Sequence, residues 1–324
     1  MIRAAAPHPG ARILGLGAHR PERVVDNAEL CASLDTSDTW IRERTGIERR
    51  YVAAPDESVV TMATVAAGKA LASAGIRPDE VDLVLVATCT HPDLFPGASP
   101  RVAAALGTTA GAVDVGAACA GFCYALAQAS DAVRAGSARH VLVAGAERLT
   151  DVADPRDRAT RVLFGDGAGA VVVGPSDEPE IGPVAWGSDG LAAHLIRSEP
   201  SVLASAPPYL RMEGPALFRW AVTQVAPVAR RACELAGVDP SHLAAFVPHQ
   251  ANLRIVDAVA SALALPSHVV VSRDVVDTGN TSAASVPLAL TRLVESGVVR
   301  SGDAALLVAF GAGLTYAAQV VLLP

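Results

Sequence analysis

One segment of this sequence occurs twice, and that repeat limits the possible folds more than any other feature. Residues 69–78 read KALASAGIRP and residues 231–240 read RACELAGVDP, and an apolar run typical of a strand follows each. The prolines that end the two segments, Pro78 and Pro240, lie 162 positions apart. The pattern in both is a helix, an Ala-Gly turn, a proline and a strand, which indicates that a structural unit has been duplicated.

Two further matches follow in the same order. Asp114–Gly116 recurs as Asp277–Gly279 at an offset of 163, and Leu142–Ala144 recurs as Leu307–Ala309 at an offset of 165. Alanine-rich helices and valine-rich strands do match by chance, but three ordered matches at nearly one offset favour a real duplication. We therefore divide the 324 residues into two halves, 1–174 and 175–324, that form pseudo-symmetric parts of one core.

Short apolar runs alternate with alanine-rich stretches, the pattern of an α/β protein with buried sheets. Hydrophobic residues make up 51% of the chain and charged ones 18%, which excludes wholesale disorder. The segment 175–215 is rich in proline and serine and is expected to be an irregular, lid-like surface loop. We expect strands over 13–16, 83–87, 112–114, 141–144, 168–173, 245–247, 269–271, 305–309 and 317–322, and helices over 58–74, 120–135, 215–236, 253–263 and 285–296.

Charge and hydropathy exclude several classes of protein. The net charge of −7 argues against a generally basic nucleic-acid binder. No apolar run approaches the ~20 residues that span a bilayer, and the N-terminal residues lack the apolar stretch of a signal peptide. We therefore expect a soluble, cytoplasmic protein without nucleic-acid or membrane partners. The five cysteines show neither a disulfide framework nor the spacing of a zinc site, so they are expected to be free thiols, most of them buried and at most one a nucleophile.

One of these cysteines, Cys119, lies where a strand gives way to a helix. The segment Asp114–Leu126 reads DVGAACAGFCYAL, in which small residues allow a tight turn and let a substrate carbonyl approach the sulfur. A thiol at a helix N-terminus is exposed to backbone N–H groups and to the positive end of the helix dipole, which favour the thiolate. The alternative is a structural cysteine, a role that suits Cys123 one turn later.

A histidine and an asparagine occupy similar positions in the second half. His249 follows the apolar strand 245–247 and precedes a helix, and α/β proteins assemble their sites at strand ends. Asn280 lies in a glycine turn that leads into another helix, at the duplicated equivalent of the Cys119 turn. Asn280 could serve only as a turn or cap residue. Symmetry would nevertheless bring the two turns together, so that cysteine, histidine and asparagine converge on one pocket suited to nucleophilic catalysis.

Two glycine-rich turns, Phe164–Gly169 and Phe310–Gly313, lead into strands and not into helices. They lack the strand–turn–helix context and the downstream acidic residue of a dinucleotide fingerprint. A close backbone approach to the site, with an N–H available to an oxyanion, fits them better. No tightly bound cofactor is expected.

Taken together, these segments resemble the beta-ketoacyl-[acyl-carrier-protein] synthase III family of the thiolase superfamily. The resemblance rests on AACAGF (117–122), PHQANLR (248–254) and GNTSAAS (279–285), and it extends to TSDTWIRERTGI (36–47) and LFGDGAG (163–169). It implies a duplicated, thiolase-like αβαβα sandwich of five layers that forms a homodimer. The amino-acid sequence around residues 272–280 is more similar to that of synthases that prime aromatic polyketides than to that of synthases of fatty-acid synthesis.

The resemblance also implies a reaction. Cys119 would take an acyl group from acyl-CoA, and malonyl-acyl carrier protein would then lose CO₂ and attack that group. Neutral His249 and Asn280 would donate hydrogen bonds to the malonyl thioester oxygen. The backbone N–H groups of Cys119 and of the turn 311–313, which includes Ala312 and Gly313, would form an oxyanion hole, and Phe310 would lie beside the malonyl carboxylate.

The resemblance also assigns residues to substrate binding. For any one exposed arginine, a solvated surface charge is a more common role than a binding residue. By similarity, CoA and the carrier-protein arm would contact Trp40, Arg44, Arg158, Asn252, Arg219 and Arg254. The acyl group would contact Leu149, Phe164 and Phe218, with Phe95 reaching across the dimer.

Other functions remain open from the sequence. An acyltransferase of the same fold would keep the acyl-enzyme but pass the group to a hydroxyl, amine or carrier-protein acceptor, although the intact Asn280 argues mildly against it. A papain-like hydrolase lacks its local cysteine signature here. A binding protein without catalysis would have no reason to place these three residues at matched turns.

Overall fold

Two five-stranded sheets of the same topology form the centre of the molecule, a computed structural model that describes residues 6–201 and 208–324. In each sheet two antiparallel pairings are followed by two parallel ones. The first sheet has the order β1 (Gly10–His19), β7 (Asp166–Ser176), β6 (Val141–Arg148), β4 (Leu83–Ala87) and β5 (Gly111–Val115). The second has the matching order β8 (Ala185–Ser188), β14 (Thr315–Leu322), β13 (Ala304–Gly311), β11 (Ala245–Pro248) and β12 (Val270–Val271).

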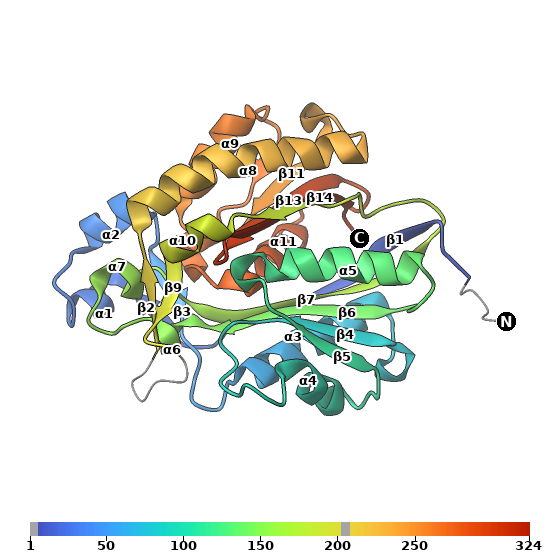
Figure 1. The fold of residues 1–324 in the computed structure, drawn as a ribbon, viewed down its shortest axis with the longest axis horizontal. Coiled ribbons are helices and arrows are strands. Elements are labelled where there is room, and N and C mark those ends of the chain that lie inside the picture. The colour runs from blue at the N-terminus through green and yellow to red at the C-terminus, as the bar shows by residue number, and fades with distance from the viewer. Residues whose placement is uncertain (1–5, 202–207) are drawn as a thin grey trace.

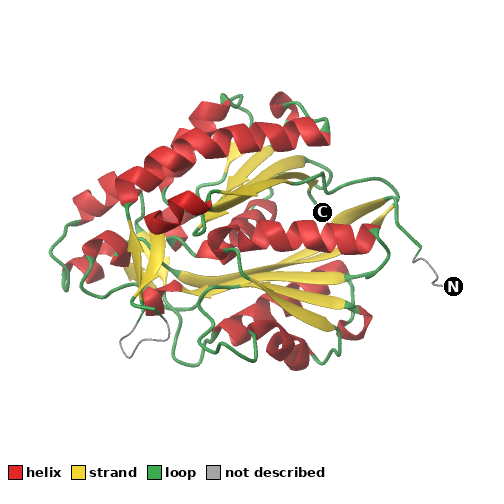
Figure 2. Ribbon diagram, viewed as in Figure 1, coloured by secondary structure: helices red, strands yellow, loops and turns green. Residues whose placement is uncertain are grey.

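Helices separate and cover the sheets, so that the molecule has five layers (Figure 1). Between the sheets lie α5 (Gly121–Arg134) and α11 (Ser285–Glu295), each in contact with strands of both. The outer face of the first sheet carries α3 (Val59–Ala74) and α4 (Ala98–Leu106), and that of the second carries α8 (Gly214–Ala236) and α9 (Leu253–Leu263). The helix–sheet–helix–sheet–helix order is also visible in Figure 2. The expected αβαβα sandwich is confirmed.

Central strands are apolar on both faces because helices cover both. In β13 the side chains of Ala305, Leu307 and Ala309 join the core between the sheets, while Leu306 and Val308 pack beneath α8 and α9. Successive side chains of a strand point to opposite faces, so a strand that is buried on both faces has a continuous apolar sequence. This is why the apolar runs of the sequence located all nine expected strands to within a few residues.

The sequence repeat corresponds to a repeated structure. Helices α3 and α8 both end at a left-handed glycine, Gly75 and Gly237, each with a φ of 66°. A short 3₁₀ turn follows in both places, Pro78–Glu80 and Pro240–His242, before the strands β4 and β11. Glycine stops these helices because it adopts positive φ without steric cost. The boundary at residues 174 and 175 stays a prediction, and β7 of the first sheet extends to Ser176.

The segment 175–215 differs from the irregular loop that its composition predicts. It contains β8 at the edge of the second sheet, a 3₁₀ helix η3 (Gly190–Leu195) and an antiparallel hairpin of β9 (Ile196–Glu199) with β10 (Tyr209–Met212). The proline and serine content of this segment predicts a loop, whereas tertiary contacts stabilise these short elements. Residues 202–207 lie outside the described part. The remaining short elements are β2 (Val24–Asp26), β3 (Arg49–Tyr51), α1 (Asn27–Cys31), α2 (Asp38–Thr45), α6 (Leu149–Val152), α7 (Arg158–Arg161) and α10 (Val275–Thr278). Within the described ranges, no helix has the length and hydropathy that crossing a bilayer requires.

Candidate active site

Two turns of the same kind meet at the seam between the halves. Cys119 lies in the 3₁₀ turn η2 (Ala118–Ala120) before α5, and the equivalent turn η5 (Ser282–Ala284) before α11 contacts it. Each turn begins with a non-glycine residue at positive φ, 44° at Ala118 and 48° at Ser282. The turns approach closely because their neighbours are small: a Cβ on Gly145 would lie 2.3 Å from the carbonyl oxygen of Ala283.

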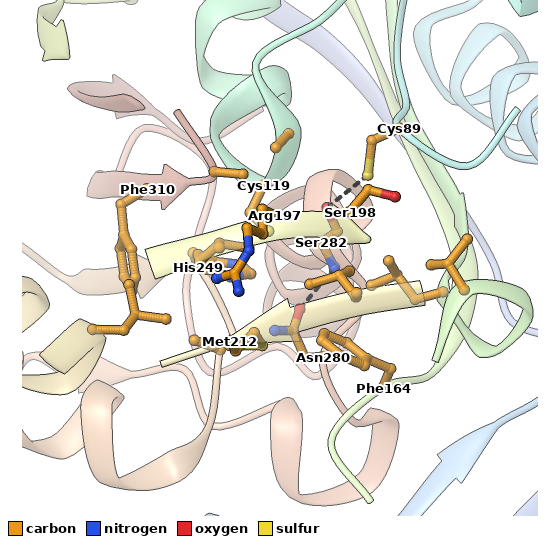
Figure 3. A pocket seen from close by; sticks show the side chains of 18 residues that line it. Cys89, Cys119, Phe164, Arg197, Ser198, Met212, His249, Asn280, Ser282 and Phe310 are labelled. Atoms are coloured by element: carbon orange, nitrogen blue, oxygen red, sulfur yellow. Dashed lines mark hydrogen bonds between the residues drawn. The ribbon is translucent and has the colours of Figure 1, made fainter. Parts of the chain in front are cut away.

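The thiol of Cys119 opens into a cavity of about 180 Å³ at this seam (Figure 3). The cavity also receives His249, Asn280, Phe310 and Ala312. The structure thus brings together the three polar residues that the sequence singled out, from the ends of different strands and turns. The other lining residues are Cys89, Ala118, Leu149, Val152, Phe164, Ile196, Arg197, Ser198, Leu210, Met212, Leu217, Ala251 and Ser282.

Burial dominates the electrostatics of the nucleophile. Desolvation raises the pKa of Cys119 to about 12, against a smaller opposing effect of a hydrogen bond with Ser282. The helix N-terminus favours the thiolate, but burial of the thiol opposes it and raises the pKa. Cys119 rests as a thiol and must lose its proton during attack. Cys123, which is fully buried on α5, has the structural role expected of it.

His249 follows β11 and is held as a neutral imidazole. Burial lowers its pKa to about 3. Its Nδ1 lies 2.7 Å from the hydroxyl of Ser285, and that hydroxyl accepts the backbone N–H of Gln250 at 3.3 Å. A hydroxyl proton donated to Nδ1 would place the ring proton on Nε2, which faces the cavity in the role assigned to this residue. The imidazole meets the ring of Phe310 edge-on, with centroids 5.4 Å apart.

The side chain of Asn280 is oriented by its own turn. Its Oδ1 accepts the backbone N–H of Ser282 at 2.8 Å, which leaves the amide NH₂ for the cavity. Its backbone is held by hydrogen bonds to Leu163 and Gly165, the start of the glycine-rich turn before β7. Asn280 and His249 therefore both present N–H donors to the same space.

The glycine-rich turn between β13 and β14 packs against the nucleophile. A Cβ on Gly311 would lie 2.6 Å from the backbone nitrogen of Cys119, so only glycine permits this approach. Ala312 lines the cavity, whereas Gly313 does not. The loop places backbone of the second half directly beside the backbone nitrogen of Cys119 in the first half.

The wall of the cavity away from the sulfur is apolar. Leu149 and Phe164 contribute to it as expected, whereas Phe218 and Phe95 do not line it. Much of the wall comes from the hairpin β9–β10 and from α8, which sequence reasoning did not assign to the site because the segment was read as irregular. These residues are Ile196, Leu210, Met212 and Leu217, with Val152 from α6.

The residues expected to bind CoA and carrier protein lie outside the cavity. The guanidinium of Arg158 stacks on Trp40 at 5.1 Å, and that of Arg254 on Phe218 at 5.4 Å. Asn252 caps α9 by accepting the backbone N–H of Ile255. Arg44 and Arg219 are exposed, and neither forms a salt bridge with a residue of 6–201 or 208–324. No group of His, Cys, Asp and Glu suited to a metal ion occurs in these same ranges.

Comparisons with known proteins agree with this geometry. The family 3-oxoacyl-[acyl-carrier-protein (ACP)] synthase III matches residues 113–190, and the family of its C-terminal part matches residues 233–323. A beta-ketoacyl-[acyl-carrier-protein] synthase III of Streptomyces lividans is 52% identical, over 97% of this chain and 95% of the relative. One from Streptomyces coelicolor is 50% identical, over 100% and 99%.

Solved structures are equally similar. The priming beta-ketosynthase of the R1128 polyketide pathway superimposes with a TM-score of 0.97 at 51% identity, covering 100% of this chain and 98% of that one. The 3-oxoacyl-(acyl carrier protein) synthase III of Pseudomonas aeruginosa has a TM-score of 0.91 at 43% identity, with 97% and 98% covered. The duplicated core, the convergent cysteine, histidine and asparagine, and these relatives have one explanation: the chain belongs to the beta-ketoacyl-[acyl-carrier-protein] synthase III family.

Proposed function

We propose that the protein loads an acyl group from acyl-CoA onto Cys119 and condenses it with malonyl-[acyl carrier protein]. The products are CoA, CO₂ and 3-ketoacyl-[acyl carrier protein], the first condensation of fatty-acid or aromatic polyketide synthesis. The observation that carries the proposal is the convergence of Cys119, His249 and Asn280 on one cavity with an apolar wall. A beta-ketoacyl-[acyl-carrier-protein] synthase III at 52% identity and the priming beta-ketosynthase of a polyketide pathway at 51% identity support it.

Acylation depends on Cys119 and on two backbone N–H groups beside it. The sulfur attacks the thioester carbonyl, and the backbone N–H groups of Cys119 and the turn 311–313 stabilise the tetrahedral oxyanion. The apolar wall with Leu149 and Phe164 then receives the acyl chain. Burial of that chain stabilises the acyl-enzyme by about 0.8 kcal/mol per methylene removed from water.

Condensation depends on the side chains of His249, Asn280 and Phe310. Loss of CO₂ leaves an enolate on the malonyl thioester, and the N–H donors of His249 and Asn280 stabilise its oxygen. Each such donor contributes about 3 kcal/mol to a transition state of this kind. Phe310 gives the carboxylate apolar surroundings, which favour a neutral leaving molecule. The nascent carbanion attacks the acyl carbonyl, and Cys119 leaves as the thiolate.

The arginines outside the cavity suit two phosphorylated ligands. The stacked pair of Trp40 and Arg158, with Arg44 nearby in sequence, offers a platform for an adenine ring and phosphates. Arg219 and Arg254, with Asn252, are assigned to the pantetheine arm and the acidic carrier protein. Electrostatic attraction of CoA and the acidic carrier protein by such exposed charges weakens as ionic strength rises.

A homodimer is part of the proposal. Strand β5 is an edge of the first sheet, and Val113 on it is 49% exposed. Leu94 and Phe95 are also exposed, at 68% and 85%. Edge strands and large exposed apolar side chains favour association. Phe95 is assigned to the acyl pocket of the second copy.

Mass spectrometry of Cys119 after incubation with a panel of acyl-CoAs tests the loading step and identifies the starter. The Cys119→Ala variant should neither acquire an acyl group nor exchange it, and persistence of exchange would overturn the proposal. Cys123→Ala is the matched control, since that thiol is buried on the same helix and outside the cavity. Release of CO₂ from malonyl-acyl carrier protein separates condensation from simple acyl transfer, which would release none.

A further inference from the structure

A buried arginine lies beside the turn that carries Asn280, and the reaction described above gives it no role. Arg50, on β3, is 1% exposed. Its guanidinium donates to three neutral oxygens: the carbonyl of Val25 at 3.3 Å, Oδ1 of Asn27 at 2.8 Å and the carbonyl of Val162 at 2.8 Å. Burial lowers its pKa to about 10, so the group stays charged at neutral pH. A buried cation is costly unless hydrogen bonds satisfy it, and these three contacts fix where the guanidinium lies.

The last of these oxygens belongs to the Phe164 turn, which comprises residues 162–165. This turn is bonded to the backbone of Asn280 on both sides. The carbonyl of Leu163 accepts the N–H of Asn280 at 2.8 Å, and the N–H of Gly165 donates to the carbonyl of Asn280 at 3.0 Å. Phe164 and Asn280 thus pair as in a parallel ladder, and Figure 3 shows both side chains at the cavity. The position of the catalytic amide therefore depends on the turn that the guanidinium holds.

The stem of Arg50 packs where these two turns meet. A Cβ on Gly279 would lie 3.1 Å from the Cβ of Arg50 and 3.0 Å from the carbonyl oxygen of Leu163. A Cβ on Gly165 would lie 3.2 Å from the Cβ of Arg50 and 2.3 Å from the carbonyl oxygen of Thr278. Glycine at both positions lets both turns approach β3 closely. Arg50 therefore contacts one turn through its guanidinium and the junction of the two through its stem.

The two residues before Arg50 contact the start of the turn that leads to the catalytic amide. The backbone N–H of Glu48 donates to the carbonyl of Val276 at 2.8 Å. Nε of Arg49 donates to Oδ1 of Asp277 at 2.9 Å. Arg49 is exposed, so its ion pair contributes little, whereas Arg50 is buried. Strand β3 of the first half thus lies along a turn of the second half, with Arg50 as its buried contact.

We propose that Arg50 is a positioning residue for condensation, which holds the Phe164 turn so that the amide of Asn280 reaches the enolate oxygen. The inference rests on the proposed function and adds a residue to it. A donor stabilises an oxyanion when it lies about 2.7–3.1 Å from the developing charge. A displacement of about 1 Å costs on the order of 100-fold in rate. Cys119 lies on the separate turn η2, so its acylation does not depend on Arg50.

The Arg50→Lys variant tests this role by comparing the two half-reactions. Lysine keeps the charge and most of the stem, but it replaces the planar fork by a single ammonium group that cannot serve the oxygens of Asn27 and Val162 in the same geometry. Release of CO₂ from malonyl-acyl carrier protein should fall by roughly 10- to 100-fold. Acylation of Cys119 by acetyl-CoA should stay close to that of the wild type. A contribution to stability alone lowers both half-reactions alike, and equal losses would overturn the proposal.

A double-mutant cycle shows whether Arg50 acts through Asn280. In the Asn280→Ala background the amide is absent, so Arg50→Lys should cause no further loss of CO₂ release. Losses that multiply would mean that Arg50 acts by another route, and they would contradict the positioning role.

Hydrogen exchange supplies a readout that needs no substrate. The backbone N–H groups of Asn280 and Gly165 join the two turns, so both should exchange faster in Arg50→Lys. Mass spectrometry of peptides that cover 160–168 and 276–284 measures them, and unchanged exchange in both peptides would refute the inference. If exchange responds as expected but the wild type releases no CO₂, the failure lies with the proposed function and not with the contact.

Two further variants separate this contact from general damage to the fold. Gly165→Ala keeps the guanidinium but forces the two turns apart, because the new methyl group overlaps the carbonyl oxygen of Thr278. It should show the same selective loss of condensation, and normal condensation would count against the proposal. Arg148→Lys is the matched control: this partly buried arginine donates to the carbonyls of Ala54 and Glu57 and does not line the cavity. Both half-reactions and the exchange of both peptides should stay unchanged in that variant.

Discussion

Single atoms decide what the residues of this site do. Both polar partners of the nucleophile have one acceptor already occupied: Nδ1 of His249 faces Ser285, and Oδ1 of Asn280 accepts Ser282 N–H. Each therefore turns a hydrogen-bond donor into the cavity. Donors oriented before substrate arrives stabilise a developing oxyanion without reorganisation, which is where electrostatic catalysis is strongest.

The tautomer of His249 gives the first prediction. Ser285→Ala removes the hydroxyl that directs the ring proton to Nε2, so release of CO₂ from malonyl-acyl carrier protein should fall about tenfold, as for loss of one neutral hydrogen bond. Acylation of Cys119 should change much less. Thr291→Val is the control on the same helix, because that hydroxyl donates only to Pro287. Equal losses in both half-reactions would contradict this role.

The buried imidazole also predicts a pH dependence of stability. His249 stays neutral in the folded protein down to a pKa of about 3, whereas in the unfolded chain it takes up a proton below about 6.5. Its contribution is therefore intact above pH 6.5 and is lost as pH falls toward 3. Between pH 7 and 5 the loss should reach about 2 kcal/mol. Urea unfolding of the wild type and of His249→Gln measures it; the variant should lose less, and identical losses would refute the assignment.

At the scale of elements, the site depends on backbones that approach closely. The turns η2 and η5 begin α5 and α11 side by side, and the loop after β13 reaches Cys119 from the other sheet. Small residues at the contacts permit this, which accounts for the many alanines at the seam. The hairpin β9–β10 contributes the apolar wall.

The close approach of Gly311 predicts a sharp steric effect. In Gly311→Ala the new methyl group would overlap the backbone nitrogen of Cys119, so the turn must move. A displacement of about 1 Å costs on the order of 100-fold in rate, and overpacking costs about 1–3 kcal/mol of stability. Acylation rate and thermal unfolding measure the two effects.

Gly68→Ala provides the control for that substitution. It lies within α3, where an added Cβ meets nothing within 4 Å. This variant should keep full activity and gain about 0.5–1 kcal/mol of stability, since alanine favours a helix more than glycine does. Full activity of Gly311→Ala would show that the loop is not held against the nucleophile.

At the scale of the whole molecule, the reaction needs both halves. Cys119 comes from the first half, and His249 and Asn280 come from the second, with the cavity at their seam. Neither sheet alone covers the helices α5 and α11, which each contact both. The duplication thus produced one core and one site.

The exposed edge of the first sheet carries the last prediction. Light scattering should give twice the mass of one chain, and Val113→Lys on β5 should shift the protein toward monomer, because a charge on an edge strand opposes pairing. Phe95→Ala should alter the choice of acyl-CoA if the side chain reaches the partner's pocket. A monomeric wild type would exclude the dimer. Val65→Lys, on an equally exposed part of α3, is the control.

The sequence by itself determined the strands, the main helices and the three residues Cys119, His249 and Asn280. Apolar runs, glycine turns and the repeat are local signals, readable without knowing what each segment packs against. The family resemblance rested on the same segments.

Only the tertiary structure decided the protonation states and the walls of the cavity. The helix start at Cys119 is visible in the sequence, but burial raises the pKa of the thiol to about 12 against the helix dipole. Ser285 carried no signal of its own, since a serine at a helix start is ordinary. Desolvation and hydrogen-bond partners depend on which distant segments cover a group, and that is set when the two halves close on each other.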